Sequence, residues 1–195
     1  YQTVNSFQNF SLSHFLFSQE SQKTIILSRF LTKKSEVIVS SNISNFIELA
    51  CVTNDQHLWF LENYQLKKYN YQTHRLVFEN SLIYNLQDFN ENTVLKSLSF
   101  HNNLLFLHTN TGFYIFDNLG NFNYFIPSIS NYFSFLENEL YFIEGQKIIS
   151  YNIFLHQKQI ISFKEKNIEF CQMNDEKIYL FDNQKNVWIY KKSIK

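Results

Sequence analysis

Short apolar runs alternate with polar turns along the whole chain, and the runs recur at similar intervals. Five of them begin at Phe15, Leu58, Leu104, Leu140 and Ile178, which are 43, 46, 36 and 38 residues apart. A turn rich in Asn, Asp and Glu precedes a typical run, and a second turn and an alternating run such as 187–190 follow it. Turn signals about every 8–12 residues are typical of all-β proteins, so each unit predicts about four short strands.

The strongest internal repeat pairs residues 51–60 with residues 171–180. Both segments begin with Cys, contain Asn-Asp and end in an apolar run, and they lie 120 residues apart. This offset is three units of about 40 residues, the period of four-stranded propeller blades. We therefore predict one β-propeller domain over residues 1–195, with about five four-stranded blades. The alternative is a two-sheet sandwich or an irregular barrel whose self-similarity is accidental.

Two parts of the chain depart from the repeat. The segment of about 80–93 lengthens one interval, which predicts a loop insertion or a short helix between blades. The last unit ends after Tyr190 without a fourth strand. Because an open strand edge promotes aggregation, we expect the segment Thr3 to Phe7 to pair with Val187 to Tyr190 and to close the propeller.

Composition supports strands and excludes some partners. Hydrophobic residues make up 45% of the chain and aromatic residues 18%, which favours pleated, half-buried surfaces. The formal net charge is zero, so the basic excess of a general nucleic-acid binder is missing. We interpret Lys191, Lys192 and Lys195 as a solvated terminus. No stretch approaches the ~20 apolar residues of a membrane-spanning helix, so direct membrane insertion is not expected.

The sequence contains no recognisable catalytic, cofactor-binding or metal-binding motif. The six His residues lack zinc-ligand spacing, and we interpret His57 and His101 as turn residues. No nucleophile motif or glycine-rich phosphate loop is present, so we predict no catalytic, cofactor-binding or metal site, no cofactor and no enzymatic activity. Cys51 and Cys171 occupy equivalent positions in units that are not neighbours, and we expect them to be reduced and buried.

Acidic and aromatic residues supply the remaining candidates for a site. Glu48 and Glu169 occupy equivalent positions, and we interpret them as solubilising carboxylates on a solvent-facing edge, with an axial position as the alternative. The aromatic residues that suit exposed binding positions are Phe122, Tyr124, Phe125, Tyr132 and Phe133. Packing in the core is the preferred interpretation for them, because aromatic residues in strands usually pack.

In its period and strand pattern, nearly the whole chain resembles degenerate β-propeller repeats of the WD and YWTD-like class, although the diagnostic Trp-Asp and Tyr-Trp-Thr-Asp motifs are absent. Such a fold implies a protein-interaction module, with a glycan-binding lectin as the alternative and an enzyme as the least favoured class. In size and composition the chain is also similar to the plug subunit of the type 9 secretion translocon of Bacteroidota-type bacteria. That resemblance implies a periplasmic protein that binds the open outer-membrane barrel of the translocon and seals it against leakage.

The start of the sequence bears on the expected compartment. The sequence begins at Tyr1 without Met. We expect an exported, mature protein whose signal peptide has been removed, and a trimmed chain is the alternative.

Overall fold

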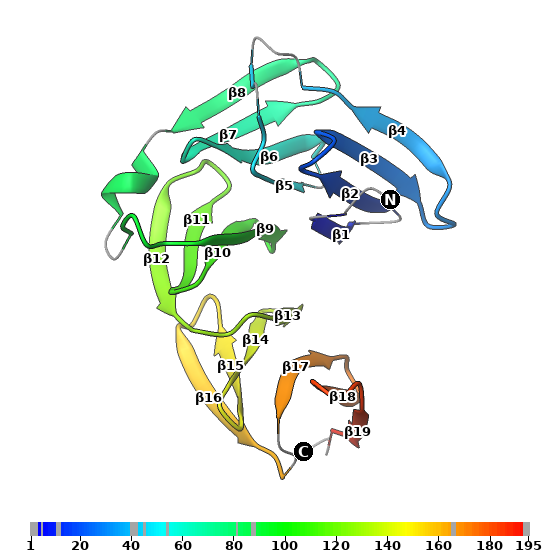
Figure 1. Ribbon diagram of the computed structural model, residues 1–195, viewed down its shortest axis with the longest axis vertical. Coiled ribbons are helices and arrows are strands. Elements are labelled where there is room, and N and C mark those ends of the chain that lie inside the picture. The colour runs from blue at the N-terminus through cyan, green and yellow to red at the C-terminus, as the bar shows by residue number, and fades with distance from the viewer. Residues whose placement is uncertain are drawn as a thin grey trace. The chain divides into compact units, whose positions relative to one another are not determined.

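The chain folds into five small antiparallel sheets, each made of strands that follow one another in sequence (Figure 1). The computed structural model describes residues 4, 6–10, 13–39, 43–44, 46–53, 55–80, 82–86, 89–164 and 167–192. These residues contain strands β1 to β19 and one short 3-10 helix, η1. The predicted all-β fold of about five blades is confirmed.

The first three blades belong to one compact unit of the chain, residues 1–109 and 113–126. The first blade has strands β1 (Ser6–Phe10), β2 (Ser13–Ser18), β3 (Lys23–Ser28) and β4 (Lys33–Val37). The second blade has β5 (Leu49–Val52), β6 (His57–Glu62), β7 (Gln65–Asn70) and β8 (Arg75–Asn80). The third blade has β9 (Leu95–His101), β10 (Leu104–Thr109), β11 (Gly112–Asp117) and β12 (Phe122–Pro127).

The last two blades belong to a second compact unit, residues 110–112 and 127–195. Their strands are β13 (Phe133–Leu136), β14 (Glu139–Glu144), β15 (Lys147–Asn152) and β16 (Gln157–Ser162); and β17 (Ile168–Met173), β18 (Lys177–Asp182) and β19 (Val187–Lys191). The five apolar runs that defined the repeat all fall in the second strand of a blade. Within the described residues, the last blade has three strands and the other four have four, as the sequence predicted.

The N-terminal strand takes a different partner from the predicted one. Ser6 and Phe7 pair with Phe17 and Leu16 of β2, so β1 is the first strand of the first blade. The prediction that this segment pairs with the last blade is therefore wrong, although Thr3 itself lies outside the described residues. The physical reason lies in Gln8, whose side-chain amide donates to the carbonyls of Val52 and Phe100 at 3.1 and 3.2 Å and ties β1 to the next two blades.

The repeat around the two cysteines differs in register by one residue. Cys51 lies opposite Trp59, whereas Cys171 lies opposite Leu180 rather than Tyr179. The hairpin loops explain the difference: the Thr53 N–H donates to the carbonyl of His57, whereas the Asn174 N–H donates to that of Lys177, a turn one residue shorter. A slip of one residue exchanges the two faces of a strand, so equivalent sequence positions have different environments.

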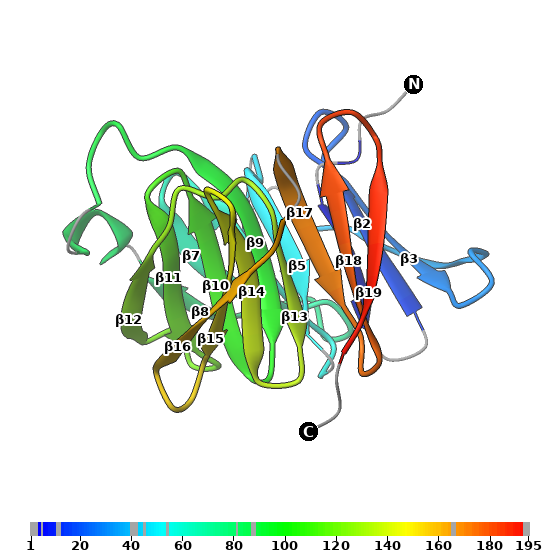
Figure 2. The same cartoon turned by 90° about the horizontal axis from the view of Figure 1, so that it is seen from below.

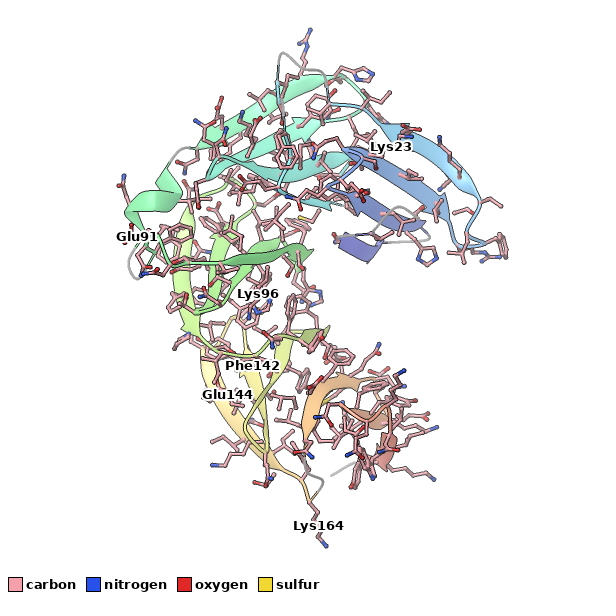
Figure 3. The ribbon with its side chains drawn as sticks, in the orientation of Figure 1. Lys23, Glu91, Lys96, Phe142, Glu144 and Lys164 are labelled. Carbon is pink, nitrogen blue, oxygen red and sulfur yellow. The ribbon has the colours of Figure 1, made fainter. Side chains whose placement is uncertain are left out.

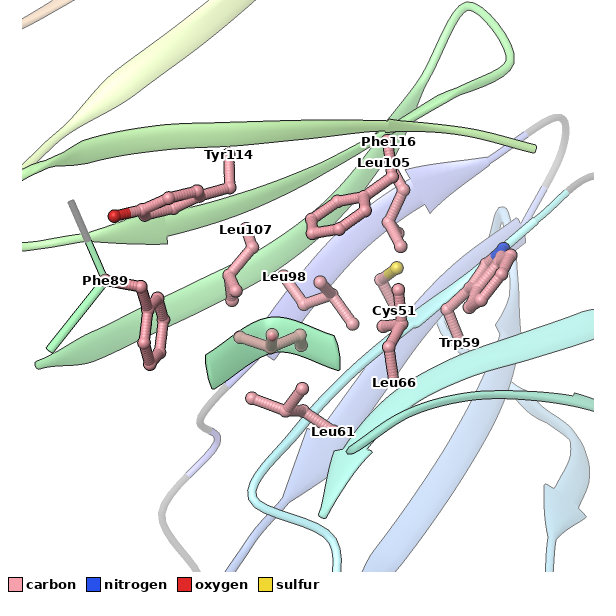
Figure 4. Close-up of a cluster of buried hydrophobic side chains, with 11 residues drawn as sticks. Cys51, Trp59, Leu61, Leu66, Phe89, Leu98, Leu105, Leu107, Tyr114 and Phe116 are labelled. Carbon is pink, nitrogen blue, oxygen red and sulfur yellow. The ribbon is translucent and has the colours of Figure 1, made fainter. Parts of the chain in front are cut away.

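The apolar core of the first unit lies between its blades. One cluster joins the second and third blades and includes Cys51, Trp59, Leu107 and Tyr114, all at most 1% exposed (Figure 4). The segment 80–93 contributes to this cluster through Ile83 of η1 (Leu82–Asn85) and through Phe89. A second cluster lies between the first and second blades. In the second unit, a further cluster packs the fourth blade against the fifth.

Gly120 in the β11–β12 turn is a glycine that the fold requires. Its φ of +83° lies in the left-handed region, and a β-carbon there would come 2.5 Å from the Phe78 ring and 3.1 Å from Trp59. The turn therefore packs directly against the core of the second blade, and only glycine allows this approach.

Candidate functional site

A polar pocket of the first unit lies where chain segments lead into β5 and β9. Its volume is about 560 Å³. It is lined by Gln19, Phe46, Glu48, Leu49, Tyr64, Thr93, Val94, Leu95 and Lys96. These residues come from the β2–β3 turn, the β6–β7 turn and the two segments that precede the first strands of neighbouring blades. No sequence motif joins them, because three different repeats supply them.

Glu48 is the distinctive residue of this pocket. Its Oε1 accepts a hydrogen bond from the Asn63 N–H at 3.3 Å, while Oε2 is buried and has no hydrogen-bond partner. Burial raises the pKa of the Glu48 carboxyl, and the nearby Glu62 carboxylate raises it further, against the effect of the Asn63 N–H. Glu48 is half-buried and so differs from an ordinary, fully hydrated surface carboxylate.

Lys96 and Tyr64 complete the polar lining. Lys96 lies on β9 (Figure 3), and burial lowers the pKa of its amino group. Tyr64 has φ of +60° in the β6–β7 turn and packs edge-on against Phe89, with ring centroids 5.8 Å apart. A positive φ is unfavourable for an aromatic residue, so the surrounding contacts must hold this turn in place. The pocket thus places a carboxyl, an amine and a phenol around one space.

The segment that leads into β5 is fixed from both sides. On one side, the Gln22 side chain accepts from the Ile47 N–H at 2.7 Å and donates to its carbonyl at 3.0 Å. On the other, Glu62 accepts from the Phe46 N–H at 3.1 Å, and Lys67 donates to the Ile43 carbonyl at 3.1 Å. These hydrogen bonds fix Phe46 and Ile47, the two residues before Glu48, which favours a preformed pocket.

The raised pKa of Glu48 predicts a pH dependence of stability. The folded state holds the proton more tightly than the unfolded state, whose carboxyl has its ordinary pKa of 4.5. This group therefore lowers stability as the pH rises from below that value through the folded pKa. We expect the unfolding midpoint of Glu48→Gln, relative to wild type, to rise between about pH 4 and pH 7.

Thermal or urea unfolding at several pH values measures this difference. Glu91→Gln, which removes an exposed carboxylate from the segment before β9 (Figure 3), is the control for the loss of one negative charge. A difference between Glu48→Gln and wild type that does not change with pH would contradict the prediction.

The other candidate residues are not gathered at this pocket. Glu169 is exposed and lines a separate pocket of about 310 Å³ in the second unit, together with Ser130, Asn131 and Tyr132. Tyr132 is 51% exposed, as a binding aromatic would be. Phe125 instead packs on the Tyr114 ring at 4.6 Å, in agreement with the core interpretation.

The remaining aromatic and His candidates lie in strands. Phe122 and Tyr124 lie in β12, Phe133 begins β13, His57 begins β6 and His101 ends β9. Among the described residues, no group of three or more His, Cys, Asp or Glu residues is placed to hold a metal ion. No helix in this part of the chain is long and apolar enough to cross a membrane.

Both cysteines are buried free thiols in the first strand of their blades, as their positions predicted. Burial raises the pKa of the Cys51 thiol well above its ordinary range and that of Cys171 to about 12. Because the thiolate is the reactive form, we expect neither to react with iodoacetamide in the native protein, and both to react after denaturation without reductant. Intact-mass measurement reads the number of modified thiols, and rapid labelling of the native protein would contradict this prediction.

Comparison with known proteins identifies the architecture. No family model and no curated protein sequence matches the chain. Kluyveromyces lactis Hsv2 matches with a TM-score of 0.68 and 8% identity, over 98% of this chain and 60% of that chain. The Neurospora crassa Pan2 WD40 domain matches with a TM-score of 0.52 and 8% identity, over 98% and 76%. The chain has a β-propeller fold.

Part of a bacterial surface protein also matches this fold. PorZ, an essential component of the type-IX secretion system of Porphyromonas gingivalis, matches with a TM-score of 0.51 and 10% identity, over 98% of this chain and 27% of that chain. The chain thus spans about three fifths of the length of Hsv2 and about a quarter of PorZ. Identities this low show the fold alone, and the degenerate propeller repeat read from the sequence agrees with it.

Proposed function

We propose that the protein is a non-enzymatic protein-interaction β-propeller. The observation that carries this proposal is the set of large apolar side chains that the second unit exposes. Phe154 and Leu155 in the β15–β16 turn are 50% and 65% exposed, Ile160 on β16 is 55% exposed, and Ile189 on β19 is 60% exposed. Exposed apolar side chains that are scattered singly are ordinary, whereas contiguous ones, such as the neighbouring Phe154 and Leu155, mark interaction sites.

A more specific role is an accessory subunit of an outer-membrane secretion translocon. Its support is the composition and size of the chain, together with a fold that PorZ also uses. In this role the protein is exported to the periplasm and binds a large outer-membrane barrel through its protein surface. It inserts no segment into the membrane and binds no nucleic acid.

Affinity purification from native membranes in mild detergent tests this role. The tagged protein is expected to recover a large outer-membrane barrel, and a Leu155→Asp variant should recover less of it. Leu119→Asp, which changes an equally exposed leucine in the first unit, is the control. Recovery of no specific protein by the folded wild type would count against an interaction module.

The Glu48 pocket favours a second candidate function, a glycan-binding propeller. Hydroxyl-rich ligands suit a buried carboxylate oxygen that lacks a donor, with an amide and aromatic rings nearby. A glycan array compares wild type with Glu48→Gln and Glu91→Gln. If the protein is a lectin, wild type and Glu91→Gln bind a defined glycan and Glu48→Gln does not. An array without signal would exclude this function for the glycans present.

A further inference from the structure

The third strand of the last blade has the sequence of a covered strand but is exposed. Residues 187–191 read Val-Trp-Ile-Tyr-Lys, and among the described residues β19 pairs with β18 alone (Figure 2). Val187, Ile189 and Tyr190 are 49%, 60% and 39% exposed. In the fourth blade, the corresponding strand β15 pairs with β16 along its outer edge, and its Ile148 and Ile149 are each 1% exposed. Two exposed fourth strands have more polar sequences, Lys-Lys-Ser-Glu in β4 and Gln-Lys-Gln in β16.

An apolar cleft lies beside this edge, within the second unit. Its volume is about 530 Å³, and its walls come from the outer strands of the fourth blade and from β18 and β19. The apolar residues that line it are Ile148, Ile161, Phe163, Ile178, Leu180 and Tyr190. Side chains of a strand alternate between its two faces. A strand laid along β19 would therefore direct every second side chain towards this cleft.

The charge at one end of the edge indicates what kind of strand fits. Lys191 lies directly opposite Lys177 in the β18–β19 ladder, and like charges in this position are unfavourable. Lys164 and Lys191 line the apolar cleft, and Lys164 extends away from the ribbon into solvent (Figure 3). A carboxylate from a bound strand would relieve this repulsion.

We propose that β19 binds an extended segment of a partner protein as the fourth strand of the last blade. The segment has apolar residues at alternate positions, which enter the cleft, and an acidic residue near Lys191. Backbone hydrogen bonds along the open edge supply affinity, and the cleft and the lysines supply selectivity. This inference rests on the proposed protein-interaction function and names its mode.

A second copy of the chain suits this edge less well. Antiparallel pairing of two β19 strands would place Lys185 of one copy, in the β18–β19 turn, beside Lys191 and Lys192 of the other. Three cations would meet at each end of such a pair, which disfavours self-association. An acidic and apolar strand from another protein meets no such repulsion.

Selection from a displayed library of random peptides, each about the length of a strand of 5–10 residues, tests the proposal. We expect the full-length protein to enrich peptides that alternate apolar residues and carry Asp or Glu at one end. The enriched peptide, made synthetically, should slow hydrogen exchange in residues 187–191. Enrichment of no such pattern, or protection elsewhere and not in β19, would overturn the proposal.

Two variants separate the edge from general surface hydrophobicity. Ile189→Asp should weaken binding of the peptide about tenfold or more, because a charge on an edge strand opposes strand pairing. Val77→Asp, at a similarly exposed position on β8 in the first unit, should leave binding unchanged. Lys191→Glu should weaken an acidic peptide several-fold and less so at high salt. Equal binding by Ile189→Asp and wild type would overturn the proposal.

The same variants distinguish this mode from the broader function. If native membranes yield one barrel with wild type and with Ile189→Asp alike, the interaction function stands and the β19 site is wrong. Light scattering supplies the remaining check. A wild-type dimer that Ile189→Asp converts to monomer would show that a second copy occupies the edge, and would overturn the partner-strand proposal.

Discussion

Leu107→Ala is expected to lower the free energy of unfolding by about 2–5 kcal/mol. Leu107 lies on β10 between Leu98 and Tyr114 of the flanking strands and is fully buried in the cluster that joins the second and third blades (Figure 4). Truncation removes apolar contacts and leaves a cavity that these neighbours fill only in part. Urea denaturation followed by tryptophan fluorescence measures the loss, since Trp59 belongs to the same cluster.

Leu119→Ala is the matched control, because it makes the same chemical change at a surface site. Leu119 is 70% exposed in the β11–β12 turn, where its N–H donates to Asp117 Oδ1 at 2.8 Å. Alanine keeps that N–H, so the stability should change by no more than about 0.5 kcal/mol. Equal losses in the two variants would contradict the assignment of Leu107 to the core.

The order of the strands was predictable because apolar runs and turns are local signals. The runs that begin at Leu58, Leu104 and Leu140 identified the second strands of three blades without any knowledge of their partners. The partner of the N-terminal strand was not predictable in this way. Its anchor is the Gln8 amide, which reaches Val52 and Phe100, and no pattern in the sequence marks a polar contact over 92 residues.

The candidate site was harder to predict than the blades. The pocket brings Glu48, Tyr64 and Lys96 together from three separate chain segments, and each residue alone is compatible with an ordinary surface position. Equivalent positions in the repeat did not predict equal burial, since Glu48 is half-buried and Glu169 is exposed. Burial depends on the neighbouring loops, which differ between blades even where the strands agree.

Glu62 and Lys67 form a buried ion pair that the strand propensities of the sequence do not predict. Residues 65–70 read Gln-Leu-Lys-Lys-Tyr-Asn, which suggests a solvated strand, yet Lys67 is 7% exposed and Glu62 is 5% exposed. Their side chains form an ion pair of 2.8 Å, and both also hold the segment that leads into β5. A buried charge is stable only while its partner is present.

Lys67→Met is therefore expected to cost about 3–5 kcal/mol, because it leaves the Glu62 carboxylate buried without its cation. The double variant Glu62→Leu/Lys67→Met removes both charges and should lose less than the sum of the two single variants. The double variant will not regain the full stability of wild type, because the Phe46 N–H and the Ile43 carbonyl lose their hydrogen-bond partners as well.

A double-mutant cycle by urea denaturation measures the coupling. The exposed pair Lys33 and Glu36, at 2.6 Å in the first blade, serves as the control, and its coupling should be far smaller because solvent screens it. If the Glu62–Lys67 coupling were equally small, water would have to reach the pair, and the segment that leads into β5 would not be rigidly held. The Glu48 pocket depends on that segment, so the cycle also tests whether the pocket is preformed.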